Sequence, residues 1–271
     1  MTFLRRLFNF YINSSIHVAL SVFSLTWITL LSLDLSYMES VLYFVFYASI
    51  TGYNFVKYFA IAKFHHRQLA NWLKLIQILS FVCFVLMCFY ATQLPLKAHV
   101  FNLCLAVITF FYAIPLLSKK STLRTIGGLK VYIIALVWTG VTVFLPLIAL
   151  DYKINTDVVL LAIQRFLFVV VLMLPFEIRD LKFDSVALST LPQKLGLRNT
   201  KLLGITILIV FFLLEFLKDE TVLISIVILF TICVIAALFV CFCKIEQNKY
   251  YSAFWVESLP ILWLIFMLYF N

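Results

Sequence analysis

The sequence has 271 residues, of which 65% are hydrophobic and only 12% are charged, with a net charge of +9. A soluble core cannot bury that much apolar surface, so the composition excludes a soluble globular protein and predicts an all-α, polytopic membrane bundle. The positive charge is expected to report membrane topology, and no nucleic-acid partner is predicted because no sizeable soluble surface exists to bind one.

Nine apolar segments are long enough to cross a lipid bilayer, at roughly 20 residues per helix. They lie near residues 12–33, 41–62, 73–93, 98–117, 129–150, 157–177, 201–217, 222–243 and 251–270. The segment at 201–217 is short for a span. We expect residues 1–271 to form one transmembrane domain.

The positions of Lys and Arg between these segments predict the topology. With the N-terminus inside, the inside loops hold 16 of the 21 Lys and Arg residues and the outside loops hold three. Basic residues are enriched in cytoplasmic loops, so the imbalance predicts nine spans with a cytoplasmic N-terminus and an external C-terminus. The long inside loops follow the second, fourth and sixth spans, which places loop-borne function on the cytoplasmic side.

The second span carries a polar pair, Asn54 and Lys57, three residues apart and therefore on one helix face. A lysine inside a span is costly and usually faces a partner or a cavity. The alternative is that Lys57 extends its amine to the headgroups from one or two turns inside the membrane.

A cluster of cations follows the fourth span, beyond Pro115, which is expected to bend or end that helix. Such a cluster suits a phosphorylated ligand, but positive-inside topology or lipid headgroup binding would also explain it. Its members are Lys119, Lys120, Arg124 and Lys130.

The sixth span holds Arg165, which is expected to extend outward or to pair with an outer acid.

The sixth span ends in the stretch with the most concentrated charge, Glu177 to Asp184. If the helix continues, Glu177, Asp180 and Asp184 fall within about 60° of one face. Three carboxylates on one stripe repel one another, which predicts a metal ion, a basic side chain or both nearby. Arg179 is expected to point away from this stripe.

The ninth span contains Glu257, about two turns from its predicted inner end. A carboxylate at that depth requires a partner or a wet cavity.

The segment Glu177-Ile178-Arg179-Asp180-Leu181-Lys182-Phe183-Asp184, together with nine spans and an inside N-terminus, resembles the UbiA superfamily of intramembrane prenyltransferases. It is similar to the second aspartate motif of that family, Asp-x-x-x-Asp, at Asp180 and Asp184. Two further segments look like UbiA sequences: Tyr112 to Pro115 with Lys119, and Thr190 to Gly196. The first family motif falls at Asn54, but Tyr58 stands where its first acid is expected, and Ala62 or Lys63 where the next is.

The resemblance implies a nine-helix bundle around a central cavity, a Mg²⁺ cofactor and a location in the bacterial inner membrane. It further implies transfer of a prenyl group from an allylic prenyl diphosphate to a lipophilic acceptor, which is expected to be aromatic. Asp180 and Asp184 would be catalytic and hold Mg²⁺, with Glu177 supporting them. Asn54, Lys57, Lys119 and Arg124 would bind the diphosphate.

Lys57 suggests how the incomplete first motif is compensated. A departing diphosphate requires positive charge around it. We hypothesise that Lys57, with Lys119 or Arg124, supplies that charge directly. The competing account is an ion pair of Lys57 with Asp180 or Glu177 that only joins the second and sixth spans.

Two other functions stay open at this stage. One is a non-catalytic relative that binds an isoprenoid or lipid, which the incomplete first motif favours. The other is a small transporter, which is less consistent with the sequence because transporters place polar sites and helix breaks near the membrane midplane.

Overall fold

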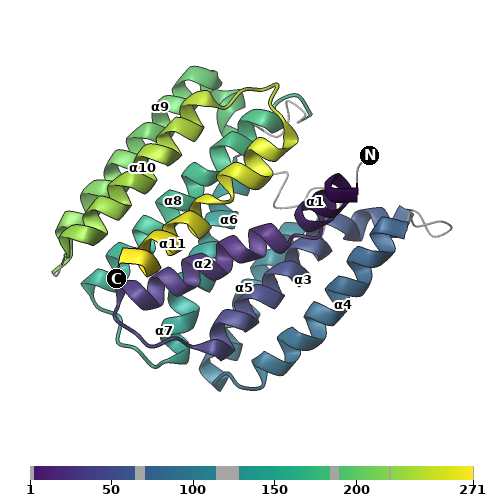
Figure 1. The fold of residues 1–271 in the computed structure, drawn as a ribbon, viewed down its shortest axis with the longest axis horizontal. Coiled ribbons are helices and arrows are strands. Elements are labelled where there is room, and N and C mark those ends of the chain that lie inside the picture. Colours follow the sequence, from purple (N-terminus) through teal and green to yellow (C-terminus); the bar gives the residue numbers. More distant parts are fainter. Residues whose placement is uncertain (1–2, 65–70, 114–127, 184–188, 220, 271) are drawn as a thin grey trace.

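The computed structural model describes residues 3–64, 71–113, 128–183, 189–219 and 221–270, of which residues 59–64, 71 and 113 are described by their backbone only. This part of the chain is helical and contains no strand (Figure 1). The helices are α1 (Phe3–Asn13), α2 (Ile16–Ser32), α3 (Glu39–Phe64), α4 (Asn71–Ala91), α5 (Leu96–Ala113), α6 (Leu129–Thr139), the π-helix η2 (Gly140–Phe144), α7 (Leu145–Ala149), α8 (Thr156–Asp180), α9 (Leu191–Leu213), the 3-10 helix η4 (Leu214–Leu217), α10 (Leu223–Phe242), the π-helix η5 (Tyr251–Val256) and α11 (Leu259–Phe270).

Each of the nine predicted spans overlaps one helix, or one run of successive helices, in the same order along the chain. Within the described residues, six helical segments are long and apolar enough to cross a membrane, and a seventh qualifies if α1 and α2 form one span bent by 52°. α3 and α5 do not meet both criteria. The predicted all-α membrane bundle is therefore confirmed, while the orientation of the termini stays a prediction.

Two helix boundaries differ from the predicted ones. The first span begins at Ile16, because the chain turns at Ser15, which has a φ of 64°. The seventh begins at Leu191, well before residue 201, because Thr190 and Gln193 form a reciprocal capping box at its start. The left-handed backbone of Gly196 (φ 76°) then kinks this helix, which joins a stretch predicted as loop to the span.

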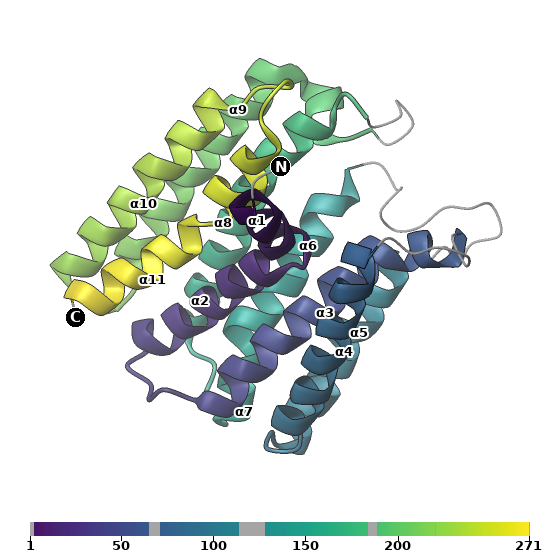
Figure 2. The same ribbon diagram turned by 45° about the vertical axis from the view of Figure 1, so that its right-hand side comes forward.

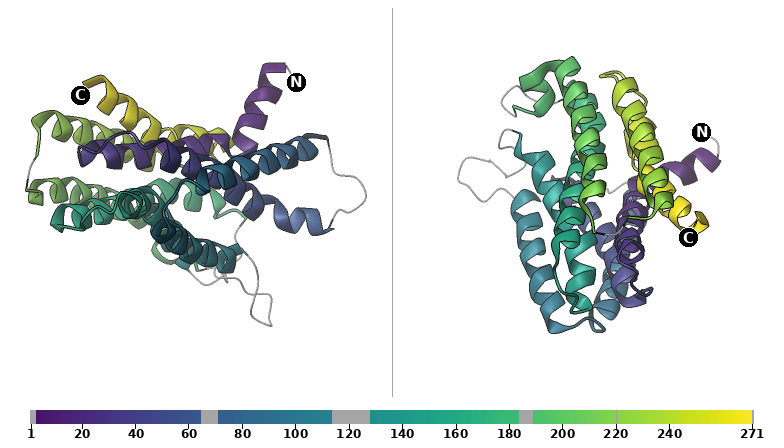
Figure 3. Two further views of the ribbon diagram at one scale, coloured as in Figure 1. Left: turned by 90° about the horizontal axis from the view of Figure 1, so that it is seen from below. Right: turned by 90° about the vertical axis from the view of Figure 1, so that its left-hand side faces the viewer.

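The helices pack in a closed series, and α8 is its most deeply buried member. Contacts lead from α2 through α11, α10, α9, α8, α6 and η2 back to α2 (Figures 1 and 2). α3 packs on α2, and α4 packs on α3. Figure 3 shows the bundle from below and from one side. In the most apolar 18-residue stretch of α8, 72% is buried inside the protein, against 17% in the corresponding stretch of α4. The acidic stretch thus ends a central helix.

Close packing around α8 depends on a glycine in α9. A Cβ at Gly204 would lie 2.8 Å from Leu174 Cδ1 on α8 and 3.0 Å from Val240 Cγ1 on α10. Both distances are shorter than ordinary van der Waals contact, so a larger residue here would require the Leu174 and Val240 side chains to shift.

Candidate active site

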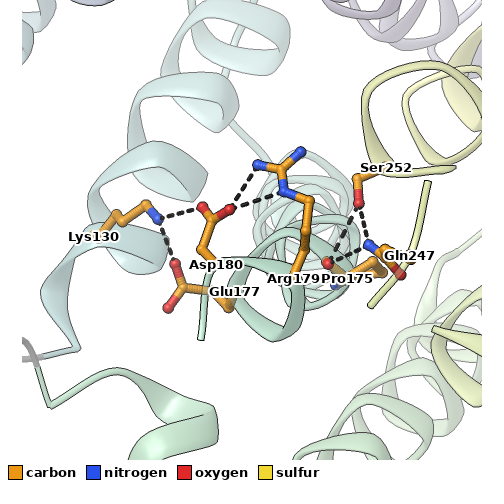
Figure 4. A network of polar contacts seen from close by, with 7 residues as sticks. All are labelled: Lys130, Pro175, Glu177, Arg179, Asp180, Gln247 and Ser252. Atoms are coloured by element: carbon orange, nitrogen blue, oxygen red, sulfur yellow. Dashed lines mark hydrogen bonds and ion pairs between the residues drawn. The ribbon is translucent and has the colours of Figure 1, made fainter. Parts of the chain in front are cut away.

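The last turn of α8 presents Glu177 and Asp180 to a lysine from the start of α6 (Figure 4). Lys130 Nζ lies 2.8 Å from Glu177 Oε1 and 3.5 Å from Asp180 Oδ2. The carboxylates are three residues apart and share one helix face, as the sequence predicts. The counter-charge expected beside the stripe is therefore present, and among the described residues Lys130 is part of it.

Arg179 supplies a second cation to the same carboxylates. Its Nη2 and Nε lie 2.8 and 2.9 Å from Asp180 Oδ1, and its guanidinium lies over the Phe176 ring, 5.2 Å from the centroid. The expectation that Arg179 points away from the stripe is wrong, because its long side chain folds back to the adjacent residue. Asp180 is thus held by one cation at each oxygen.

The end of α8 is tied to the chain that connects α10 with η5. Gln247 Nε2 donates to the Pro175 carbonyl at 3.0 Å and to Ser252 Oγ at 2.6 Å, and Ser252 Oγ donates to the same carbonyl at 3.4 Å (Figure 4). These bonds fix the helix two residues before Glu177, so the backbone that carries the two carboxylates has limited freedom.

Asn54 lies on α3, contacts the turn between α1 and α2 with its side chain, and is only 3% exposed. Its Oδ1 accepts from Ser15 Oγ at 2.8 Å, and its Nδ2 donates to the Ser14 carbonyl at 3.0 Å and to Ser80 Oγ at 2.8 Å. The Asn54 amide therefore joins the turn, α3 and α4. Its contact with a diphosphate stays a prediction. In this structure, the hydrogen bonds of the Asn54 amide all go to protein groups.

Lys57, one turn further along α3, is exposed and donates from Nζ to Ser15 Oγ at 3.0 Å. Among the described residues it makes no ion pair within 4 Å, and the charges of Lys57 and Arg179 act on Glu257 only at longer range. Tyr58, which stands where the family has an acid, donates its hydroxyl to the Asn13 carbonyl at 2.9 Å. Lys57 is thus bonded to the turn at Ser15, and the alternative of an ion pair with Asp180 or Glu177 is wrong, because Lys130 and Arg179 pair with those carboxylates.

Glu257 enters this group because of the π-helix η5 that precedes it. A π-helix shifts the direction of the side chains that follow and is frequent at functional sites. Ser21 Oγ donates to the Glu257 carbonyl, and a nitrogen of His17 lies 2.9 Å from the Phe254 carbonyl, so α2 holds this irregular segment in place. The depth of Glu257 in the ninth span was the signal for a polar partner, but its partners were not predicted.

The described charged groups balance one another. Three cations come from three different helices: Lys57 on α3, Lys130 on α6 and Arg179 on α8. Three carboxylates lie among them, namely those of Glu177, Asp180 and Glu257. We call these six residues the polar cluster. Ion pairs join Glu177 and Asp180 of the predicted site to Lys130 and Arg179. Lys57 and Glu257 are linked to this group only by longer-range electrostatic interaction.

The remaining predicted site residues, Asp184, Lys119 and Arg124, lie outside the described residues. Within the described part of the chain, no three His, Cys, Asp or Glu side chains are placed to hold a metal ion.

Arg165 takes neither of its two expected arrangements. It is 1% exposed and makes no ion pair within the described residues. Instead, Nη1 donates to the Leu25 carbonyl at 2.9 Å, Nη2 donates to Thr29 Oγ1 at 3.2 Å, and the guanidinium lies 5.7 Å from the Trp263 ring. Bonds to neutral groups of α2 satisfy the charge inside the bundle.

The fold has counterparts among solved structures. The apo structure of a UbiA homolog from Aeropyrum pernix K1 aligns over 93% of this chain and 97% of its own, with a TM-score of 0.65 and 14% identity. A digeranylgeranylglyceryl phosphate synthase aligns over 98% of this chain and 96% of its own, with a TM-score of 0.56 and 15% identity. No family model and no curated protein matches the sequence. These two likenesses establish the UbiA fold, as the sequence resemblance predicts.

Proposed function

We propose that the chain is a UbiA-type intramembrane prenyltransferase that uses an allylic prenyl diphosphate and a lipophilic, aromatic acceptor. The observation that supports this best is the pair of cations, Lys130 and Arg179, that contacts the two carboxylates at the end of α8 in a UbiA-like bundle. A solved structure of a digeranylgeranylglyceryl phosphate synthase has the same fold. The proposal includes a single domain over residues 1–271 and a location in the bacterial inner membrane.

The proposed reaction breaks the bond between the prenyl C1 and a diphosphate oxygen, and the electron pair leaves with the diphosphate. The acceptor forms the new bond to C1 and releases a proton. The chain's own task is to stabilise the departing anion, because preorganised cations in a site that excludes water lower the barrier most where charge develops. Lys57 is exposed and stands at the position of the first family motif, so it is our candidate for the first contact with the diphosphate.

The Mg²⁺ that the resemblance implies would be held by Asp180 and Asp184, with Glu177 in support. The described donors do not fit such a site. Lys130 lies between the oxygens of Glu177 and Asp180, and Arg179 holds the other oxygen of Asp180. A divalent ion at these two residues would have to displace one or both cations. We therefore assign anion stabilisation to the side chains of the protein.

Turnover of a labelled prenyl diphosphate in membranes that contain the protein tests the proposal, with several chain lengths and acceptors. We expect a prenylated product that depends on the protein and falls strongly with Asp180→Ala. Lys57→Ala tests the role of that lysine: lost binding at normal folded yield supports a diphosphate contact, whereas normal binding with collapsed yield supports a structural role through its bond to Ser15. Equal turnover in Asp180→Ala would remove this residue from the mechanism.

The second candidate is a non-catalytic protein of this fold that binds an isoprenoid or lipid. It is favoured by Asn54 and Tyr58, whose polar groups bond to the protein at the position of the first motif. Binding of a prenyl diphosphate without turnover across all chain lengths and acceptors would support it.

A further inference from the structure

The position of Lys130 is that of a bridging cation. It enters from the first turn of α6 and contacts two carboxylates at the end of α8, so one ammonium group joins two helices. Its side chain is 19% exposed, whereas that of Glu177 is 2% exposed. An ammonium group carries three N–H donors. A partly exposed ammonium held by two carboxylates can offer its remaining donor to a third anion.

The sequence next to Lys130 and Asp180 adds more cations than acids. The polar cluster itself has three cations and three carboxylates. The sequence of 114–127, which leads directly to Gly128 and α6, adds Lys119, Lys120 and Arg124 and contains no acid, whereas 184–188 adds only Asp184. By sequence, these two segments together carry three cations and one acid.

The α3 side of the cluster points to the same kind of ligand. An acidic side chain at position 58 could approach a diphosphate only with a cation between the two negative groups. This chain has Tyr58 there, and the Tyr58 hydroxyl donates to the Asn13 carbonyl. One residue earlier, Lys57 carries a positive charge and is exposed. Thus each half of the site holds an ammonium group, Lys57 next to Tyr58 and Lys130 against Glu177 and Asp180.

We infer that this chain binds the diphosphate group of its substrate without a divalent metal, and that the Lys130 ammonium bridges the Glu177 and Asp180 carboxylates to the diphosphate. The inference rests on the proposed function, since it concerns the same substrate class. It differs from the implied cofactor in one measurable respect: removing divalent ions leaves the affinity for the diphosphate intact.

Binding of farnesyl S-thiolodiphosphate, a poorly ionising analogue, to the full-length protein in detergent tests this inference. Calorimetry with EDTA and with Mg²⁺ is expected to give dissociation constants within about threefold of each other. Lys130→Gln is expected to weaken binding roughly tenfold or more in both media, because it removes a charged hydrogen bond. Lys182→Gln is the matched control: Lys182 is exposed and lies over the Phe183 ring, 4.8 Å from its centroid, and its loss is expected to leave binding within about threefold.

Three results would overturn the inference: binding that requires Mg²⁺, unchanged affinity in Lys130→Gln, or an equal loss in Lys182→Gln. If Lys130→Gln fails to fold, the double variant Lys130→Gln/Glu177→Gln carries the same expectation, because it removes both charges of the pair together. Absence of binding in either medium, with geranylgeranyl and longer analogues as well, would overturn the proposed function itself. Binding that appears only with Mg²⁺ would leave the proposed function standing.

Discussion

The polar cluster and the opposite half of α8 both place charge inside the bundle, but they differ in how accessible that charge is. In the cluster, the Lys130, Asp180 and Arg179 side chains keep exposures of 19, 22 and 24%. Arg165 lies 15 positions before Asp180, or roughly 22 Å along the helix, and is 1% exposed. Charges that stay partly exposed can exchange partners with a ligand, whereas a fully buried charge holds helices together.

The polar groups of the buried half bond to other helices of the protein. Arg165 bonds to α2, and Gln164 Nε2 donates to the Phe211 carbonyl at 3.1 Å and to Glu215 Oε2 at 2.9 Å, which joins α8 to α9 and η4. Lys218 Nζ lies 2.6 Å from the same Glu215 oxygen. We therefore expect substitutions in this half to change stability and leave ligand affinity alone, while substitutions in the polar cluster change affinity.

Arg165→Ala is expected to have the largest effect on stability. It leaves a cavity among α2, α8 and α11 and removes the bonds to Leu25 and Thr29, so we expect a loss of about 2–5 kcal/mol in the free energy of unfolding. Thermal unfolding in detergent measures this loss. Affinity for a prenyl diphosphate, per folded molecule, should equal that of the wild type. A large loss of affinity at unchanged stability would contradict the division between the two regions.

Gly204→Ala is expected to destabilise by about 1–3 kcal/mol, because the new methyl group overlaps Leu174 and Val240. Gly52→Ala is the matched control on the peripheral α3, where a Cβ meets no atom within 4 Å. There the removal of a helix-interior glycine should stabilise by roughly 0.5–1 kcal/mol. Unfolding curves for the two variants that shift in the same direction would show that α8 is not the tightly packed centre.

Gln164→Leu should have a smaller effect, a loss of about 1 kcal/mol in the free energy of unfolding. The substitution replaces the buried hydrogen bonds of the Gln164 amide with an apolar side chain of similar size. Glu215 keeps its contact with Lys218 in this variant. The same unfolding assay measures the change. An effect as large as that of Arg165→Ala would mean that the link between α8 and η4 contributes more than the link between α8 and α2.

Much of the fold was predictable from the sequence because membrane spans follow from length and apolarity. Neither the turn at Ser15 nor the early start of α9 was predictable in the same way, because both depend on local side-chain bonds within polar stretches. Of the candidate site, Glu177 and Asp180 followed from helical periodicity, since residues three apart share a face.

The partners of these acids did not follow from periodicity. Lys130 reads in the sequence as one of several loop cations, and only the packing of α6 against α8 brings it to Glu177. Arg179 was misjudged because backbone direction does not fix where a long flexible side chain ends. Glu257 had a visible signal in its depth, but its neighbours depend on the π-helix η5, which no simple sequence pattern predicts.

The most direct test of the central claim is the affinity of Glu177→Gln for the thiolodiphosphate analogue, measured in EDTA and in Mg²⁺. If Lys130 is the cation that binds the diphosphate, removing one of its carboxylates leaves the lysine in place and removes a nearby negative charge. The dissociation constant should then be equal to that of the wild type or lower in both media. A wild-type affinity that rises with Mg²⁺, and a Glu177→Gln variant that loses this rise, would contradict the claim and identify Glu177 as a metal ligand.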